Sequence, residues 1–327
     1  MRMKGLWATV LAPALAIAFV LMTGQGAATP VTSEMAVHGT SPSGPSLASE
    51  LTWKGGTAVP SVASKVKTLC SGLTFTAAAV YNESQTRAYV EDWNTGNLTL
   101  CGAGRNSTIA TAPSGYAGDG YYGMAGLVVS GKLDLILISW GIHAGWYCLG
   151  ATAKGCAKRS AFTLPPSFCT NQTKGFCNPD GIVLESNLAF TYVDVVNADL
   201  VSCSPKAHAC SNDTASSAFT GQLPVDITQL GSTLYVSDNN CTGYIWKGTT
   251  KSMKVLYTEG NALEGISFVN KTLYVADDAS CGGNAGILKA KTGVELPTPI
   301  TGDAEIVGLD AALQFSVPAA KAVYSTK

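Results

Sequence analysis

The stretch GSTLYVSDNN at residues 231–240 returns almost unchanged as KTLYVADDAS at residues 271–280. Each copy has a polar turn followed by alternating apolar residues that end on an aspartate, Asp238 or Asp277. Alternation with a period of two predicts a half-buried β-strand, and the turn before it predicts a hairpin. Because the two copies are about 40 residues apart, they indicate a repeated structural unit, and further copies are expected elsewhere in the chain.

A unit of strand, polar turn and second strand occurs five times, and a sixth, shorter copy begins at Gly308. The five units start at Ala79, Gly126, Gly181, Val225 and Gly265. The spacing between starts is 40 to 55 residues, which is the range of β-propeller blades. The cysteines agree with this alignment, because three of them follow the start of their unit by 22 residues and two by 16: Cys101, Cys148, Cys203, Cys241 and Cys281. The repeat predicts an all-β protein, a six-bladed β-propeller.

The last unit is too short to supply four strands. We expect residues 49–73 to provide the missing outer strand or strands of the last blade, because this closure removes an exposed sheet edge. A β-sandwich has no reason to repeat at this period, and a βαβ fold needs helical periodicity that the sequence lacks.

The N-terminal residues 1–28 have two positive charges, then an apolar run and small residues, the order of a cleaved secretory signal peptide. The alternative is an uncleaved anchor, because the apolar run is nearly long enough to span a bilayer. Residues 29–48 are rich in Ser, Thr, Pro and Gly and are expected to form a flexible leader. The propeller domain is predicted to occupy residues 49–327.

The formal net charge is −1 and no basic run occurs, which argues against nucleic acid and acidic membrane surfaces as partners. No stretch after the N-terminal run is apolar enough to cross a membrane. Once the signal is removed, we therefore expect a secreted monomer without a membrane span.

Ten cysteines behind a signal peptide are expected to form disulfides. We read the segments after the second strand of two units as a third strand, a loop and a fourth strand, with a cysteine on either side of the loop. This reading pairs Cys148 with Cys156 and Cys203 with Cys210, and a loop before the third blade pairs Cys169 with Cys177. Elimination leaves Cys70 with Cys101 and Cys241 with Cys281, although sequence does not fix connectivity. A zinc site is disfavoured, because no C-x-x-C occurs and the chain has only three histidines.

The chain contains more N-glycosylation sequons than its composition would produce by chance, which indicates a secretory route. They are at Asn82, Asn97, Asn106, Asn171, Asn212, Asn240 and Asn270.

The units resemble those of NHL-repeat and YVTN-type propellers, which run strand, glycine-containing turn, then LYV-x-D. The resemblance covers residues 75–317 and is strongest at TLYVSD and TLYVAD. It implies a fold that serves both binding modules and enzymes, and therefore no single function. The aspartate that ends four of the units is expected to accept backbone N–H groups in the following turn, a structural role.

The residues just before the first strand of each blade are expected to face the central channel. This column contains Ala78, Ala125, Asp180, Pro224, Glu264 and Val307. Around its two acids, PDGIVL and LEGISF are similar to strand starts of the gluconolactonase/regucalcin hydrolases, and the first also to those of strictosidine-synthase-like proteins. That resemblance implies that Asp180 and Glu264 bind Ca²⁺ or another divalent cation. A third ligand is not evident, and Asn178 is offset by two positions. The structural alternative is that both acids cap turns or meet solvent.

The first hypothesis for function is a secreted, disulfide-stapled and glycosylated propeller that works as a binding module for a protein, carbohydrate or small-molecule ligand. The second is a metal-dependent hydrolase of the gluconolactonase-like type that uses Asp180 and Glu264. A third is a cell-surface structural protein held by its N-terminal anchor. The sequence does not decide whether the protein is an enzyme, and no catalytic residue is assigned.

Overall fold

The computed structural model describes the greater part of the chain, with gaps. The described residues are 32–35, 46–54, 65–73, 76–82, 84, 86–92, 95–102, 105–111, 121–139, 144–157, 160–164, 179–185, 187–195, 197–204, 209–212, 218–260, 262–269, 272–277, 281, 286–290, 294–295, 306–311 and 321–326. The expected signal peptide, residues 1–28, lies outside them. So do the three histidines, the pair Cys169 and Cys177, and the sequons at Asn171 and Asn270. Among the helices in the described ranges, none is long and apolar enough to cross a membrane.

Five of the sheets formed by the described residues have four antiparallel strands that follow one another in the chain. The first contains β4 (Thr76–Tyr81), β5 (Ala88–Asp92), β6 (Asn97–Gly102) and β7 (Arg105–Ala110). The second contains β8 (Tyr121–Val129), β9 (Lys132–Ser139), β10 (Ala144–Cys148) and β11 (Ser160–Thr163). The third contains β12 (Pro179–Leu184), β13 (Phe190–Asp194), β14 (Asp199–Ser204) and β15 (Ala209–Asn212). The fourth contains β16 (Pro224–Leu230), β17 (Thr233–Asp238), β18 (Tyr244–Thr249) and β19 (Ser252–Thr258). The fifth contains β20 (Leu263–Val269), β21 (Thr272–Asp277), β22 (Gly286–Lys289) and β23 (Val294–Glu295).

Strands from both ends of the described chain share one further sheet. Its order is β24 (Ile306–Ala311), β25 (Lys321–Thr326), β1 (Thr32–Met35), β2 (Ser46–Lys54) and β3 (Lys65–Leu73). Strand β1 lies within residues 29–48, which the sequence analysis assigned to a flexible leader. The difference has a simple cause: β1 pairs with β2 and β25 through main-chain hydrogen bonds, which do not depend on apolar side chains.

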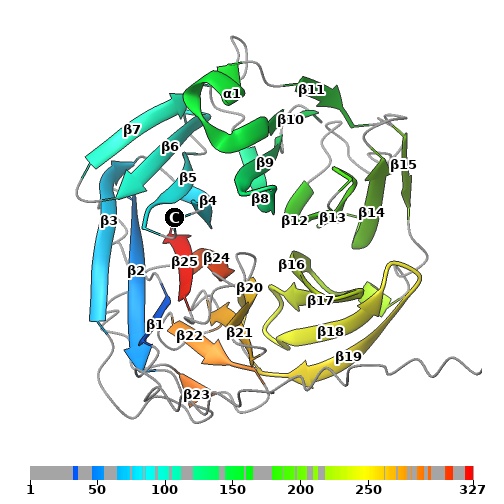
Figure 1. Ribbon diagram of the computed structural model, residues 1–327. Helices are drawn as coiled ribbons and strands as arrows, with labels where there is room; N and C mark the ends of the chain where they lie inside the picture. Colours follow the sequence, from blue (N-terminus) through cyan, green and yellow to red (C-terminus); the bar gives the residue numbers. More distant parts are fainter. Residues whose placement is uncertain are drawn as a thin grey trace, which may run out of the picture.

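The sheets are arranged in a ring, and the first strand of each, β4, β8, β12, β16, β20 or β24, is the one nearest the centre (Figure 1). The hydrophobic core lies in the seams between neighbouring sheets. Strand β9 illustrates the reason: Leu135 and Leu137 pack toward the first sheet, while Ile136 and Ile138 pack toward the third. Because alternate side chains point to opposite faces, a strand covered on both sides is apolar at consecutive positions.

Each of the six innermost strands has a register shift near its start. In β12 the shift falls between Pro179 and Ile182, and in β20 between Leu263 and Ile266. In β16 it falls between Pro224 and Ile227. The remaining shifts are in β4, β8 and β24. Such bulges bend the strand and aim its side chains in new directions.

The bulges correct the column of channel residues that the sequence alignment proposed. Asp180 and Glu264 do occupy equivalent positions, one residue after the paired residue that opens the strand. In the fourth sheet, however, the equivalent residue is Val225 rather than Pro224, and the next residue is Asp226. Because Pro224 itself is the paired opening residue, the alignment was one residue out of register there. In β8 the alignment was three residues out of register, because the equivalent residue is Tyr122 rather than Ala125.

Three disulfides join described cysteines, and all three are pairs that the sequence analysis proposed: Cys148–Cys156, Cys203–Cys210 and Cys241–Cys281. Cys203 and Cys210 lie opposite each other on β14 and β15, as expected for a staple across a hairpin. Cys101 is also disulfide-bonded. Cys241 follows β17 and Cys281 follows β21, so their bond links two neighbouring sheets.

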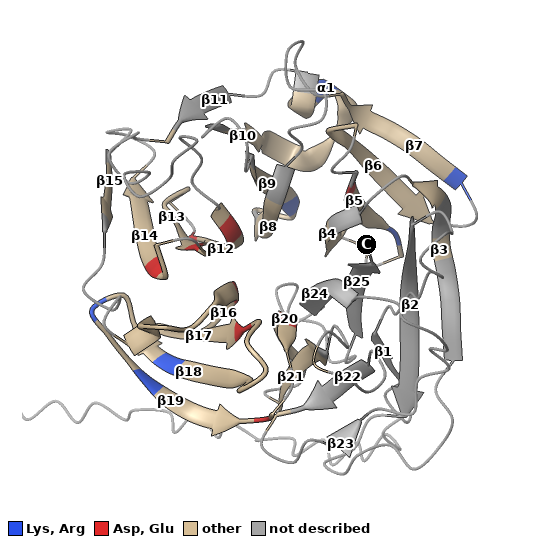
Figure 2. Ribbon diagram, turned by 180° about the vertical axis from the view of Figure 1, so that it is seen from behind, with Lys and Arg blue, Asp and Glu red and all other residues tan. Residues whose placement is uncertain are grey.

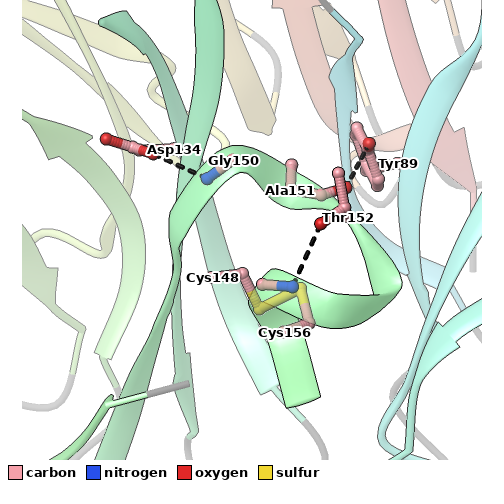
Figure 3. The surroundings of a disulfide bond; sticks show 8 residues. Tyr89, Asp134, Cys148, Gly150, Ala151, Thr152 and Cys156 are labelled. Carbon is pink, nitrogen blue, oxygen red and sulfur yellow. Dashed lines mark hydrogen bonds between the residues drawn. A yellow bond between two sulfur atoms is a disulfide. The ribbon is translucent and has the colours of Figure 1, made fainter. Parts of the chain in front are cut away.

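The surroundings of Cys156 differ from the expected fourth strand. Residues Leu149–Ala151 form a 3₁₀ turn, η1, and Ala153–Ala157 form a short helix, α1, before β11 begins. Figure 3 shows the disulfide closing this insertion onto β10, with the backbone N–H of Cys156 donating to the carbonyl of Thr152. The Tyr89 hydroxyl, from the first sheet, donates to the carbonyl of Ala151. The insertion therefore bridges two sheets.

Candidate functional site

A cavity of about 810 Å³ opens among the innermost strands of four sheets. Its wall is formed by the C-terminal halves of β8, β12 and β16, by β20, and by the turns that follow β16 and β18. Residues that line it include Glu185, Thr228, Ser232, Thr249 and Phe268. A cavity of this volume matches the size of pockets that hold drug-sized ligands.

The described residues of the wall are a mixture of polar and apolar residues, and the only charged ones among them are acidic. Hydroxyl groups come from several strands and turns, namely Thr191, Thr228, Ser232, Thr249, Thr250 and Ser267. Two carboxylates, Glu185 and Asp226, belong to the wall, and none of the wall's described residues is Lys, Arg or His. Lys and Arg segments appear on β7, β18 and β19, and one also lies beside β8, where β9 begins at Lys132 (Figure 2). The wall thus suits a ligand that is neutral or positively charged.

Asp226 is the first residue of β16 that contributes to the cavity wall. Its Oδ1 accepts a hydrogen bond of 2.8 Å from the backbone N–H of Ile227. Its Oδ2 accepts one of 2.8 Å from the backbone N–H of Ile266, on β20 of the next sheet. Burial raises the pKa of Asp226 to about 7, although the two N–H donors act in the opposite direction. This carboxyl therefore changes charge near neutral pH.

Gly181 of β12 makes room for the Asp226 carboxylate. A Cβ atom at this glycine would lie 2.1 Å from Oδ1 of Asp226, 2.4 Å from its Cα and 2.6 Å from the backbone nitrogen of Ile227. Gly123 of β8 is equally close to the third sheet, since a Cβ there would lie 2.2 Å from the carbonyl oxygen of Asp180. Glycine at the bulge lets successive innermost strands approach backbone to backbone.

The two acids expected to bind a metal lie on the innermost strands but outside the cavity wall. Glu264 is buried, and its Oε1 accepts a hydrogen bond from Nδ2 of Asn239. The carbonyl of Glu264 also accepts a hydrogen bond of 2.6 Å from the Ser237 hydroxyl. Asp180 is partly buried on β12. Across the part of the chain that the structure describes, no group of three His, Cys, Asp or Glu side chains is placed to hold a metal ion. These residues alone do not complete a divalent-cation site.

Two of the aspartates that end the units, Asp194 and Asp238, accept hydrogen bonds in the turns that follow them. Asp194 accepts from the backbone N–H of Asn197 at 3.1 Å and from its side chain at 2.7 Å. Asp238 accepts from the backbone N–H of Asn240, in the turn that follows it, at 3.2 Å, and from that of Leu223, just before β16, at 2.9 Å. Both side chains are fully buried. The expected structural role is thus seen at these two positions.

The described sequons differ in exposure. Asn106 lies on the outer strand β7, where Arg105–Thr108 are all exposed. Asn82, Asn97 and Asn240 are partly buried. Asn82 also uses its Oδ1 to accept hydrogen bonds of 3.0 Å from the backbone N–H groups of Thr86 and Arg87.

Comparison with solved structures identifies the architecture. Virginiamycin B lyase from Staphylococcus aureus matches 90% of this chain and 99% of its own, with a TM-score of 0.54 and 15% identity. A chain of the nidogen/laminin complex matches 85% of this chain and 97% of its own, with a TM-score of 0.57 and 13% identity. The chain folds as a β-propeller. A protein described as a putative gluconolactonase also matches this propeller, over 78% of this chain and 89% of its own, with a TM-score of 0.50 and 13% identity.

These identities are low, so the likeness concerns the fold alone. No family model matches the sequence, and no curated protein sequence does. The site of this propeller must therefore be argued from its own residues.

Proposed function

We propose that this protein is a secreted, N-glycosylated, six-bladed propeller, closed by strands from both ends of its chain, that binds a small polar ligand in the cavity at the centre of its ring. The observation that carries the proposal is the cavity itself, which is large enough for a drug-sized molecule and is lined by residues of four sheets, three of which contribute hydroxyl or carboxylate groups. Disulfides between and within sheets support an oxidising compartment.

The binding proposal is tested with the full secreted chain and a ligand-observed NMR screen of small polar fragments. The test variant is Thr228→Trp, which fills the cavity from β16, and the matched control is Ser252→Trp on the exposed strand β19. Hits that persist in the control but vanish in Thr228→Trp support the proposal. If Thr228→Trp does not fold, Ser232→Trp in the exposed turn after β16 replaces it. A screen without hits, or hits indifferent to these substitutions, contradicts it.

The secretory part of the proposal is tested separately by mass spectrometry of protein recovered from a eukaryotic secretory host. We expect cleavage near residue 28, glycans at exposed sequons such as Asn106, and paired cysteines. A mature chain that retains residues 1–28 would instead support the membrane-anchored alternative.

A second candidate is the metal-dependent hydrolase. One observation favours it: Asp180 and Glu264 occupy equivalent positions at the bulges of β12 and β20. This reading requires at least one further oxygen ligand beside these two carboxylates. Calorimetric titration with Ca²⁺, beside the double variant Asp180→Ala/Glu264→Ala, tests it. Heat of binding that the double variant abolishes supports the metal site, and a wild-type protein that binds no Ca²⁺ contradicts it.

A further inference from the structure

The cavity wall contains two carboxylates and no cationic side chain among its described residues, and this excess of negative charge favours a cationic ligand. Resting on the proposed binding function, we propose that the cavity selects polyhydroxylated small molecules that carry a protonated amine, with the Asp226 carboxylate as the counter-charge. The rest of the wall would hydrogen-bond the hydroxyl groups of such a ligand.

The charges that face the cavity come from only two of its elements in the described structure. Strand β12 ends beside Glu185, which is exposed, and β16 contributes Asp226, which is partly buried. The wall residues of β8 and β20 and of the turn after β18 are uncharged. Lys251 follows that turn but is exposed and does not belong to the wall. An anionic ligand would meet two like charges in a partly desolvated space, whereas a cation would meet opposite ones.

Asp226 has acceptor capacity left for a ligand. An ionised carboxylate offers about four lone-pair directions on its two oxygens. The N–H groups of Ile227 and Ile266 use one direction on each oxygen. Those two donors also hold the carboxylate in place, so it pays little rotational entropy when a ligand ammonium binds.

Exposure separates Asp226 from the propeller's turn aspartates. Asp194 and Asp238 also accept backbone N–H groups, but both are fully buried, and neither belongs to the cavity wall. Asp226 is partly exposed and lines the wall. A purely structural carboxylate has no need to face a cavity.

Hydroxyl groups dominate the remaining polar wall; Thr228, Ser232, Thr249 and Thr250 all come from the fourth sheet and its turns. Hydroxyls both donate and accept, which matches the hydroxyl groups of a polyol or sugar. Leu127, Val183 and Phe268 supply apolar surface for its C–H faces. The amine then adds a charge-assisted hydrogen bond, which is stronger than a neutral one.

Three cellobiosides matched in size test the proposal: a 2-aminoethyl, a 2-hydroxyethyl and a carboxymethyl glycoside. Calorimetric titration of the full chain at pH 8 should give about tenfold tighter binding for the amine than for the hydroxyl probe, and weakest binding for the carboxylate. Asp226→Asn should reduce the ratio of amine-probe affinity to hydroxyl-probe affinity from about ten to about one. Glu185→Gln, on an exposed side chain, should have a smaller effect.

Proton release provides a readout that needs no variant. At pH 6.5 part of the Asp226 population is protonated, so binding an ammonium there should release protons. Titrations in two buffers of different ionisation enthalpy should therefore give different heats for the amine probe and equal heats for the hydroxyl probe. This measurement decides the matter if Asp226→Asn does not fold.

The outcomes separate the two proposals. Equal binding of all three probes, or preference for the carboxylate, overturns the amine preference and leaves the binding function standing. If no cellobioside binds, the test uses the fragments whose binding is lost in Thr228→Trp. If none of those fragments is cationic, the amine preference is overturned. Only the absence of any Thr228→Trp-sensitive hit overturns the binding function.

Discussion

Oδ2 of Asp226 accepts a hydrogen bond of 2.8 Å from the backbone N–H of Ile266, which joins the innermost strands of two neighbouring blades. The pKa of Asp226 is raised from 3.8 to about 7, so the folded protein holds this proton more tightly than the unfolded chain does. Its contribution to stability is therefore fully present below about pH 4 and is lost as the pH rises through about 7.

Asp226→Asn removes this titration, because an amide does not ionise; its Nδ2 cannot accept one of the two backbone N–H groups, which adds a loss of stability that is the same at every pH. We expect the free energy of unfolding of the variant to improve relative to wild type between pH 5 and pH 8, as measured by urea denaturation. Glu185→Gln, on the exposed side of the cavity, serves as the control. A difference between Asp226→Asn and wild type that does not vary with pH would contradict the assignment.

Gly181→Ala is expected to lower the free energy of unfolding by about 1–3 kcal/mol, the usual cost of overpacking. The new methyl group would lie 2.4 Å from the Cα of Asp226, so backbone as well as side chain must move. Gly221→Ala is the control, because a Cβ there has open space, with only its φ of +74° as an obstacle. Thermal unfolding of both variants should show the larger loss at Gly181, and equal losses would argue against close packing of β12 on β16.

Two buried tyrosines make a matched pair. The Tyr147 hydroxyl donates a hydrogen bond of 2.7 Å to the carbonyl of Leu188, and Tyr147→Phe should cost about 0.5–1.5 kcal/mol. The Tyr192 hydroxyl is buried and has no hydrogen-bond partner within the described structure. Tyr192→Phe should therefore leave stability unchanged or raise it slightly. Chemical denaturation of both variants tests the contrast, and a larger loss at Tyr192 would show that its hydroxyl does have a partner.

The disulfides should differ in their contribution to stability. The Cys241–Cys281 bond spans 40 residues and the Cys203–Cys210 bond spans seven. Loop-closure entropy predicts about 4 kcal/mol for the longer loop and about 2.5 kcal/mol for the shorter. Double replacement of each pair by serine, followed by urea denaturation, measures both values. A loss at Cys203–Cys210 that equals or exceeds the loss at Cys241–Cys281 would refute this ranking.

The sequence was sufficient to predict β-strands in repeated units and the equivalence of Asp180 and Glu264. The alternation of apolar and polar residues and the repeated terminal aspartate can both be read from the sequence. It missed Asp226 for two reasons. The turn after β16 consists only of Gly231 and Ser232, whereas the turn between β12 and β13 of the third sheet is longer. An alignment that places the first strand at a fixed distance before the terminal aspartate is therefore out of register in one of the two sheets. In addition, a bulge changes which residue faces the channel without changing the hydrophobic pattern.

The insertion that contains Cys156 was misread for a related reason. Ala153–Ala157 is a single turn of helix, too short to produce helical periodicity in the sequence. The cavity could not have been predicted either, because its wall is assembled from strands that are distant in sequence and meet only in the ring. The sequence signal that could have indicated Asp226 is the short turn before β17: allowing for its length when counting back from Asp238 brings the first strand into the correct register.

The sheet shared by the chain's two ends imposes an order of events during protein synthesis. Strands β1, β2 and β3 leave the ribosome first, while their partners β24 and β25 emerge only after every other described sheet has been made. The earliest strands must wait, with an open edge, through most of translation. The ring therefore cannot close until the intervening blades have been synthesised.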